Sequence, residues 1–164
     1  MEVVKARNLI IGKGRPKICV PIVAATREEI LDEAGALAGM PVDLAEWRVD
    51  WYEDAMDLPK VLETAGMARE ILGDTPFLFT FRTEREGGEK AMGAEEYIAL
   101  NKAAAESGYV DLLDVELFTG DEAVMAVIEH AHRHQVKVIV SSHDFRKTPS
   151  REEMLGRMRK MQDL

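Results

Sequence analysis

The chain has 164 residues, of which 46% are hydrophobic, and a formal net charge of −9 at pH 7. This length and composition predict a single domain over residues 1–164 with one sizeable core. The acidic balance argues against nucleic acid or an anionic membrane surface as a partner.

Cysteine content and hydropathy indicate the setting of the protein. Cys19 is the only cysteine, which excludes an internal disulfide and a zinc cluster built from cysteines. No run approaches the roughly 20 apolar residues of a membrane span. The N-terminal residues also lack the apolar core of a signal peptide. We therefore expect a cytoplasmic protein.

Strand-like and helical segments alternate along most of the chain. Residues 3–17 come first, and Gly12 and Gly14 predict a hairpin that turns around them and covers one end of the sheet. The predicted strands that follow lie at residues 17–22, 43–49, 76–82, 110–117 and 136–142. The predicted helices lie near residues 26–38, 58–72, 93–107, 120–134 and 149–162. Five repeated βα units predict a parallel sheet, either open and doubly wound or part of a barrel.

Local signals mark the predicted helix boundaries. Thr26 and Thr119 each begin an S/T-x-x-E pattern, which predicts a capping box. Thr148 before Pro149 predicts a cap for the last helix. Three glycines follow helical runs and predict left-handed helix ends: Gly39, Gly73 and Gly108.

One face of each predicted strand becomes polar towards its carboxyl end, where parallel sheets bind their ligands. The aligned residues are Leu44, Glu46, Arg48 and Asp50; Leu78, Thr80 and Arg82; Leu112, Asp114 and Glu116; and Ile139, Ser141 and His143. Charges on an inner face are costly unless they pair or bind something. The pattern predicts a pocket for an anionic, hydroxyl-rich small molecule, because guanidinium groups bind carboxylate and hydroxyl oxygens with fixed geometry.

Structural explanations of the same residues stay open at this point. Glu46 and Arg48 also fit an internal salt-bridge network, and a lone histidine at a strand end is more often structural than catalytic. Trp47 is typical of a core position.

Three histidines near the end of one predicted helix resemble a metal motif. His130 and His134 would share a face of that helix, whereas His132 would not, and no third ligand is evident. Imidazoles also interact favourably with the last carbonyls of a helix. The sequence therefore predicts no metal site.

The segment EREGGEK at residues 84–90 follows the third predicted strand. It lacks the G-x-x-x-x-G-K-[ST] pattern of a phosphate loop, and its acidic residues would repel phosphate. Its two glycines allow a loop that brings Glu86 towards His143. A carboxylate bound to one imidazole nitrogen orients the ring and raises its basicity.

Five motifs in order resemble those of a known enzyme family. They are EWRVD at 46–50, LFTFRTEREGGE at 78–89, LLDVELF at 112–118, SSHDFRKTP at 141–149 and RMRKMQ at 157–162. Together they resemble type I 3-dehydroquinate dehydratase along essentially the whole chain.

The resemblance implies a (β/α)8 TIM barrel, of which this chain covers about the first five βα units plus the hairpin. It implies a homodimer that uses no metal or organic cofactor. The implied reaction is the dehydration of 3-dehydroquinate to 3-dehydroshikimate in the shikimate pathway of aromatic amino acid biosynthesis. In this family a lysine forms a Schiff base with the C3 ketone, and a histidine takes the C2 proton and assists loss of the C1 hydroxyl.

The motifs also imply roles for individual residues. His143 is the base, and Glu86 is the partner that orients it. The residues assigned to the substrate are Glu46, Trp47, Arg48 and Arg82. The resemblance places the Schiff-base lysine on a sixth strand beyond Leu164, together with about three further βα units. We therefore expect residues 1–164 alone to lack dehydratase activity by the Schiff-base route. Two alternatives are another proton-abstracting barrel, such as an aldolase, and an inactive partial barrel that serves as a binding or assembly module.

Overall fold

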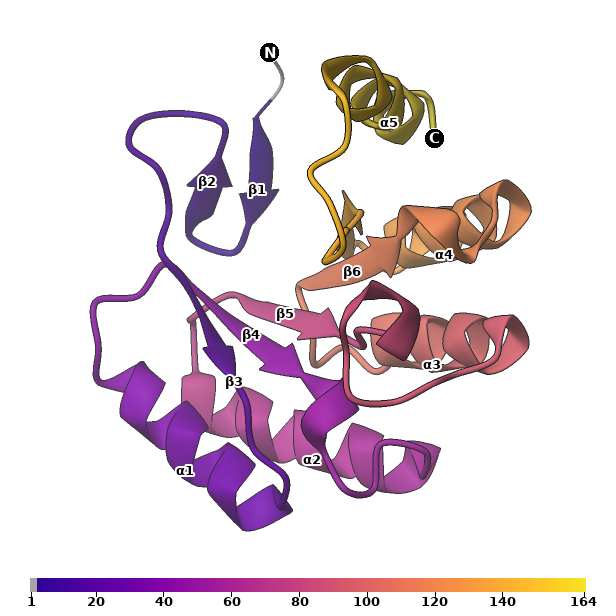
Figure 1. Ribbon diagram of the computed structural model, residues 1–164. Coiled ribbons are helices and arrows are strands. Elements are labelled where there is room, and N and C mark those ends of the chain that lie inside the picture. Colours follow the sequence, from indigo (N-terminus) through magenta and orange to yellow (C-terminus); the bar gives the residue numbers. More distant parts are fainter. Residues whose placement is uncertain (1–2) are drawn as a thin grey trace.

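The computed structural model describes residues 3–164 and is organised around a parallel sheet with strand order β3-β4-β5-β6-β7 (Figure 1). The strands are β3 (Cys19–Ile22), β4 (Leu44–Arg48), β5 (Phe77–Thr80), β6 (Leu112–Glu116) and β7 (Lys137–Ser141). The helices are α1 (Arg27–Ala38), α2 (Leu58–Leu72), α3 (Ala94–Glu106), α4 (Asp121–Arg133) and α5 (Arg151–Asp163). Each strand is followed by one helix, so the prediction of five βα units is confirmed.

Short 3₁₀ turns follow three of the strands and redirect the chain into the next helix. They are η1 (Val49–Trp51), η2 (Glu84–Glu86) and η3 (Leu117–Thr119). No helix among residues 3–164 is long and apolar enough to cross a membrane.

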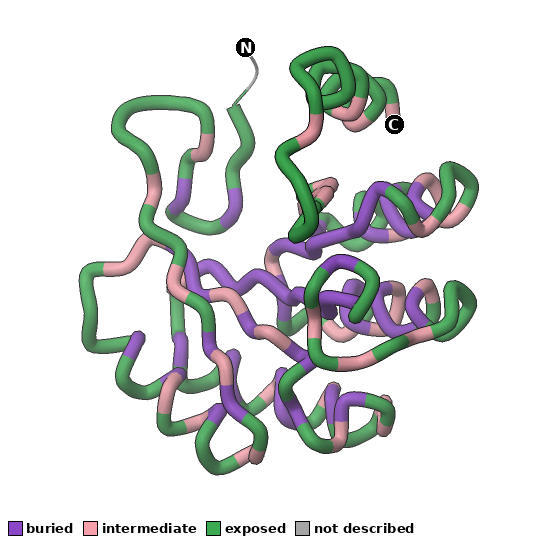
Figure 2. The backbone as a smooth tube through the Cα atoms, viewed as in Figure 1, coloured by how far each residue is buried: buried purple, intermediate pink, exposed green. Residues whose placement is uncertain are grey.

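The apolar face of the sheet packs under the helices and forms the main core. In Figure 2 buried residues concentrate along the central strands and the helix sides that face them, whereas α5 contains none. Trp47 is fully buried in this core and meets Phe79 edge to face at 5.8 Å between ring centroids. The side chain of Trp47 therefore has a core role, because alternation directs it away from the polar face, and the assignment of this residue to the substrate stays a prediction.

A hairpin precedes the sheet, but its turn is not where the sequence predicts it. Strands β1 (Val4–Ala6) and β2 (Leu9–Ile11) are antiparallel, and Ala6 pairs with Leu9. The turn therefore consists of Arg7 and Asn8, with Arg7 at a φ of 50°. The predicted turn around Gly12–Gly14 is wrong, because a two-residue turn with a positive φ can use other residues and leaves these glycines in the following loop.

The hairpin does cover the amino-terminal end of the sheet, as predicted. Ala6 and Leu9 form a buried cluster with the first inner-face residues of three strands, which are Leu44, Leu78 and Leu112. Arg7 Nε donates a hydrogen bond to Asp111 Oδ1 at 2.7 Å. The opposite, carboxyl-terminal end carries the polar side chains of the inner face.

Helix starts follow local capping chemistry, with two shifts from the predictions. Thr26 forms the predicted capping box with Glu29. Thr119 does not cap α4, because it closes the turn η3 and leaves Gly120 as the N-cap. Ser150, rather than Thr148, caps α5 and forms a capping box with Glu153. In both cases the predicted cap lies too early in the sequence.

The three glycines predicted to end helices behave differently. Gly73 and Gly108 have positive φ values of 54° and 74°, in agreement with the prediction. Gly39 has a φ of −90° and ends α1 with an ordinary right-handed residue. The prediction of a left-handed end is therefore wrong for Gly39.

Candidate active site

Arg82 is the centre of a buried polar network just beyond the end of β5. Its Nη2 donates to Asp114 Oδ1 at 2.8 Å. Its Nη1 donates to Ser141 Oγ at 2.9 Å and to Glu116 Oε1 at 3.2 Å. The network joins the carboxyl ends of β5, β6 and β7, as the alternation of side chains predicts. Arg82 itself is only 6% exposed.

Burial dominates the electrostatics of Asp114. It raises the pKa of this carboxyl above its ordinary value. The Arg82 guanidinium and a hydrogen bond donated by the Ser141 hydroxyl lower the pKa, but they do not cancel the effect of burial. Asp114 also interacts with His143 and Glu46, which places these residues around one shared polar site.

His143 is held from two sides by the carboxylate of Glu86. The backbone N–H of His143 donates to Glu86 Oε2 at 2.8 Å, and Nδ1 of the ring lies 3.0 Å from the same oxygen. Glu86 is 5% exposed, whereas the side chain of His143 is 38% exposed. A proton held on Nδ1 by the carboxylate leaves Nε2 as the free basic nitrogen. The arrangement therefore supplies a fixed, solvent-accessible base.

The loop after β5 folds Glu86 back over the strand ends. Turn η2 contains Glu86, and Gly87 follows it with a left-handed φ of 86°. Gly88 then donates its backbone N–H to Thr83 O at 2.9 Å. A Cβ on Gly88 would lie 1.9 Å from the carbonyl oxygen of Arg82, so only glycine fits this close approach.

Replacement of Gly88 by alanine is expected to displace the Glu86 loop. The added methyl group collides with backbone atoms that cannot move independently, and overpacking of this kind costs about 1–3 kcal/mol. Urea denaturation measures this loss, and histidine NMR shifts report the position of the His143 ring. Gly35→Ala in α1 is the matched control, because its Cβ makes only an ordinary 4.0 Å contact with the side chain of Ile71 in α2. Equal effects of the two changes would contradict the prediction.

Arg48 and Glu46 lie on the same inner face, at the end of β4. Arg48 binds Asp50 through Nε and Nη2, each at 2.8 Å, and these hydrogen bonds raise the pKa of Arg48. Asp50 is fully buried, and its carboxylate also accepts hydrogen bonds from the backbone N–H groups of Arg82 and Glu89. Glu46 is half-buried and forms no hydrogen bond or ion pair with another described residue.

The structure thus brings together most of the residues that the sequence predicts for the site. Arg82, Glu86 and His143 share one network, and Arg48 joins it through Asp50. Four residues that carry the network were not assigned to the site from sequence: Asp50, Asp114, Glu116 and Ser141. The alternation of side chains had placed all four on the inner face. An acidic residue on a face that is expected to be buried is the signal that could have identified Asp50, Asp114 and Glu116.

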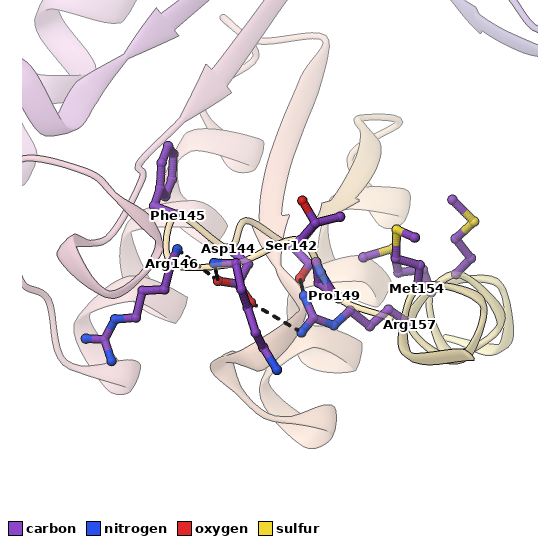
Figure 3. Close-up of a pocket in the computed structure, with 11 residues that line it drawn as sticks. Ser142, Asp144, Phe145, Arg146, Pro149, Met154 and Arg157 are labelled. Atoms are coloured by element: carbon purple, nitrogen blue, oxygen red, sulfur yellow. Dashed lines mark hydrogen bonds and ion pairs between the residues drawn. The ribbon is translucent and has the colours of Figure 1, made fainter. Parts of the chain in front are cut away.

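A separate open cavity of about 600 Å³ lies between the loop after β7 and α5. Figure 3 shows Arg157 of α5 reaching towards Ser142 and Asp144 of the loop. Arg157 Nη1 donates to Ser142 Oγ at 3.1 Å, and Nη2 lies 3.9 Å from Asp144 Oδ2. None of the predicted site residues lines this cavity, so it is distinct from the polar network.

Comparison with protein families identifies the chain. The model of the family described as type I 3-dehydroquinase matches residues 18–164. The chain belongs to the type I 3-dehydroquinase family. It is 50% identical over all 164 residues to the 3-dehydroquinate dehydratase of Salmonella agona (strain SL483). It spans 65% of the length of that curated relative.

Solved structures agree with this family assignment. A type I 3-dehydroquinate dehydratase from Clostridium difficile, with covalently modified comenic acid, matches with a TM-score of 0.97 and 46% identity over 99% of this chain and 64% of that chain. The 3-dehydroquinate dehydratase from Enterococcus faecalis matches with a TM-score of 0.94 and 46% identity over 98% of this chain and 67% of that one. The five βα units are therefore part of a TIM barrel.

Proposed function

We propose that this chain provides the general base and most of the substrate site of a 3-dehydroquinate dehydratase, a hydro-lyase. The observation that carries the proposal is the contact between Glu86 and His143 beside the Arg82 network. A proton next to a ketone is weakly acidic, and its removal needs a positioned base with a free nitrogen lone pair. The Nε2 atom of His143 meets this requirement.

The proposed reaction proceeds through a Schiff base. A lysine amine condenses with the C3 ketone of 3-dehydroquinate and releases water. The resulting iminium draws electrons, so His143 Nε2 can take the C2 proton and leave an enamine. The enamine expels the C1 hydroxyl, which receives the proton from His143 and leaves as water. Hydrolysis of the imine then consumes one water and releases 3-dehydroshikimate.

The proposed lysine is not one of residues 1–164. Strand β7 is an edge of the five-stranded sheet. A further parallel strand paired with this edge would present its carboxyl end beside the end of β7, close to His143. We assign the lysine to such a strand.

The substrate is proposed to contact the less enclosed polar residues of the inner face. Glu46 pairs with no side chain among residues 3–164, and Arg48 is held by Asp50 with its guanidinium partly exposed, so both can meet ring hydroxyls. Arg82 is more enclosed, with three side chains bound to it. Arg82 is therefore proposed to hold the network together, and its direct contact with the substrate stays a prediction.

A chimaeric barrel tests the proposed function directly. Residues 1–164 would be joined to the remaining carboxyl-terminal third of the Clostridium difficile relative, whose backbone superposes with a TM-score of 0.97. We expect NMR to show conversion of 3-dehydroquinate to 3-dehydroshikimate, and borohydride to trap a covalent adduct with the substrate. A folded chimaera without either property would refute the proposal, provided that the intact relative is active in the same assay.

A homodimer in the cytoplasm is part of the same proposal, and sedimentation of the chimaera tests the subunit number.

The alternative function, an inactive assembly module, is favoured by apolar side chains that are exposed along the loop after β7 and on α5. They are Phe145, Met154, Leu155 and Met158. An inactive chimaera, together with a stable oligomer of residues 1–164 alone, would favour this alternative.

A further inference from the structure

A second cluster of ligating side chains lies at the end of the fold opposite the Arg82 network. His130 is in the last turn of α4, and His134 is the C-cap of the same helix. Glu106 is the last residue of the neighbouring helix α3. The ligand atoms of these three side chains all lie within 4.8 Å of one another. The two helices pack side by side (Figure 1), which supplies the third ligand that the sequence alone does not reveal.

The contact between His130 and Glu106 is short but is not a satisfied hydrogen bond. Nε2 of His130 lies 2.8 Å from Glu106 Oε1. The same Nε2 is buried and has no hydrogen-bond partner of acceptable geometry among the described residues. A nitrogen and a carboxylate oxygen placed in this way can both direct a lone pair at a common ion.

The two imidazoles are also arranged as paired ligands. The rings of His130 and His134 lie 4.9 Å apart between centroids and are tilted by 33°. Residues four apart share a face of a helix, which is the spacing that helical zinc sites use. Around a tetrahedral zinc ion, ligand atoms at 2.0–2.1 Å from the metal lie about 3.3 Å from one another. The side chains of Glu106 and His134 are exposed, so they are free to rotate towards that geometry.

The local charge favours a cation. Both α3 and α4 end at this cluster, so their unpaired carbonyl groups add partial negative charge to the Glu106 carboxylate. One cation competes, because Arg133 Nη2 lies 3.4 Å from His130 Nδ1. Arg133 is exposed, so it can turn towards solvent when Nδ1 carries the proton that ligation through Nε2 requires.

We propose that Glu106, His130 and His134 form a binding site for a divalent transition-metal ion, with Zn²⁺ as the expected ion. Two imidazoles and one carboxylate suit Zn²⁺ and leave a fourth position for water, whereas Mg²⁺ and Ca²⁺ prefer oxygen ligands. The bound ion links the ends of α3 and α4 from outside the barrel. It is therefore expected to stabilise the fold without contacting His143 or Glu86.

Calorimetric titration of the purified, metal-free protein with ZnCl₂ tests the site. We expect one equivalent to bind and a Tm that rises by several degrees at saturating Zn²⁺, because the ion binds the folded state preferentially. His134→Ala is the main variant, since this exposed side chain can be removed without a cavity. It is expected to weaken binding at least tenfold and to abolish the rise in Tm.

His132→Ala is the matched control, because it removes an exposed histidine from the same helix but from outside the cluster. It should bind Zn²⁺ like the wild type, and Glu106→Gln should bind more weakly. MgCl₂ should give no rise in Tm with any of these proteins. The proposal is overturned if the wild type binds no Zn²⁺ at micromolar concentration, or if His134→Ala binds as tightly as His132→Ala.

Discussion

Replacement of His143 by alanine is expected to lower kcat of the chimaeric barrel by about 10²- to 10⁴-fold, the usual contribution of a general base. The side chain is partly exposed and lies outside the main core, so its removal should leave the fold intact. Steady-state rates with 3-dehydroquinate measure the effect, and circular dichroism checks folding. His132→Ala, on an outer helix, is the control and should keep full activity.

Glu86→Gln separates positioning of the base from its chemistry. The amide has nearly the shape of the carboxylate but lacks its charge, so it holds the Nδ1 proton of His143 less strongly. We expect kcat to fall, but less than in His143→Ala, and KM to change little.

The result that would contradict the role of His143 is a high residual activity. If His143→Ala kept more than about a tenth of the wild-type kcat, His143 would not be the base that the proposal requires.

Replacement of Arg82 by methionine is expected to be the most destabilising change in the polar network. It removes the cation that binds Asp114 and Glu116 and lies 3.8 Å from Glu86. All three carboxyl groups are nearly inaccessible, and breaking a buried pair of this kind costs about 3–5 kcal/mol. The free energy of unfolding in urea measures the loss. Lys147→Met, which breaks an exposed pair with Glu153, is the control and should change stability little.

The loss in Arg82→Met should depend on pH with a defined sign. Asp114 already has a pKa above the ordinary aspartate value of 3.8 when Arg82 is present. At a pH between the ordinary pKa of the unfolded state and the raised pKa of the folded state, the folded state binds more protons than the unfolded state. The free energy of unfolding therefore falls as pH rises through this range. Without Arg82 this pKa rises further. The deficit relative to wild type should therefore be larger at about pH 8 than at about pH 5. A deficit independent of pH would contradict this account.

The parts of the fold that follow from local periodicity could be predicted from the sequence. Alternation along a strand has a period of two, so Glu46 and Arg48 had to share a face opposite Trp47. Neighbouring parallel strands align their carboxyl ends, so Arg82 had to approach Asp114 and Ser141 across the sheet. These inferences required no knowledge of side-chain positions.

Features that depend on packing between distant segments could not be predicted in this way. Nothing local distinguishes Glu106 from other exposed acids, and only the packing of α3 on α4 brings it to His130. Asp50 lies on the predicted face, but the sequence does not show that it binds the loop that carries Glu86. Its carboxylate accepts hydrogen bonds from the backbone N–H groups of Arg82 and Glu89, which flank that loop. The cap of α5 was predicted at Thr148 but lies at Ser150, because both side chains can cap a helix and the choice depends on where the helix starts.

The amino-terminal hairpin has a consequence for the order of folding. Its two strands have three residues each and are too short to persist alone. Its docking partners include Leu112, and Arg7 binds Asp111, a contact across 104 positions of the chain. During synthesis the hairpin must wait until β6 has emerged before it can bury Ala6 and Leu9 against Leu112. The hairpin is therefore expected to dock late, as contacts of long sequence separation generally do.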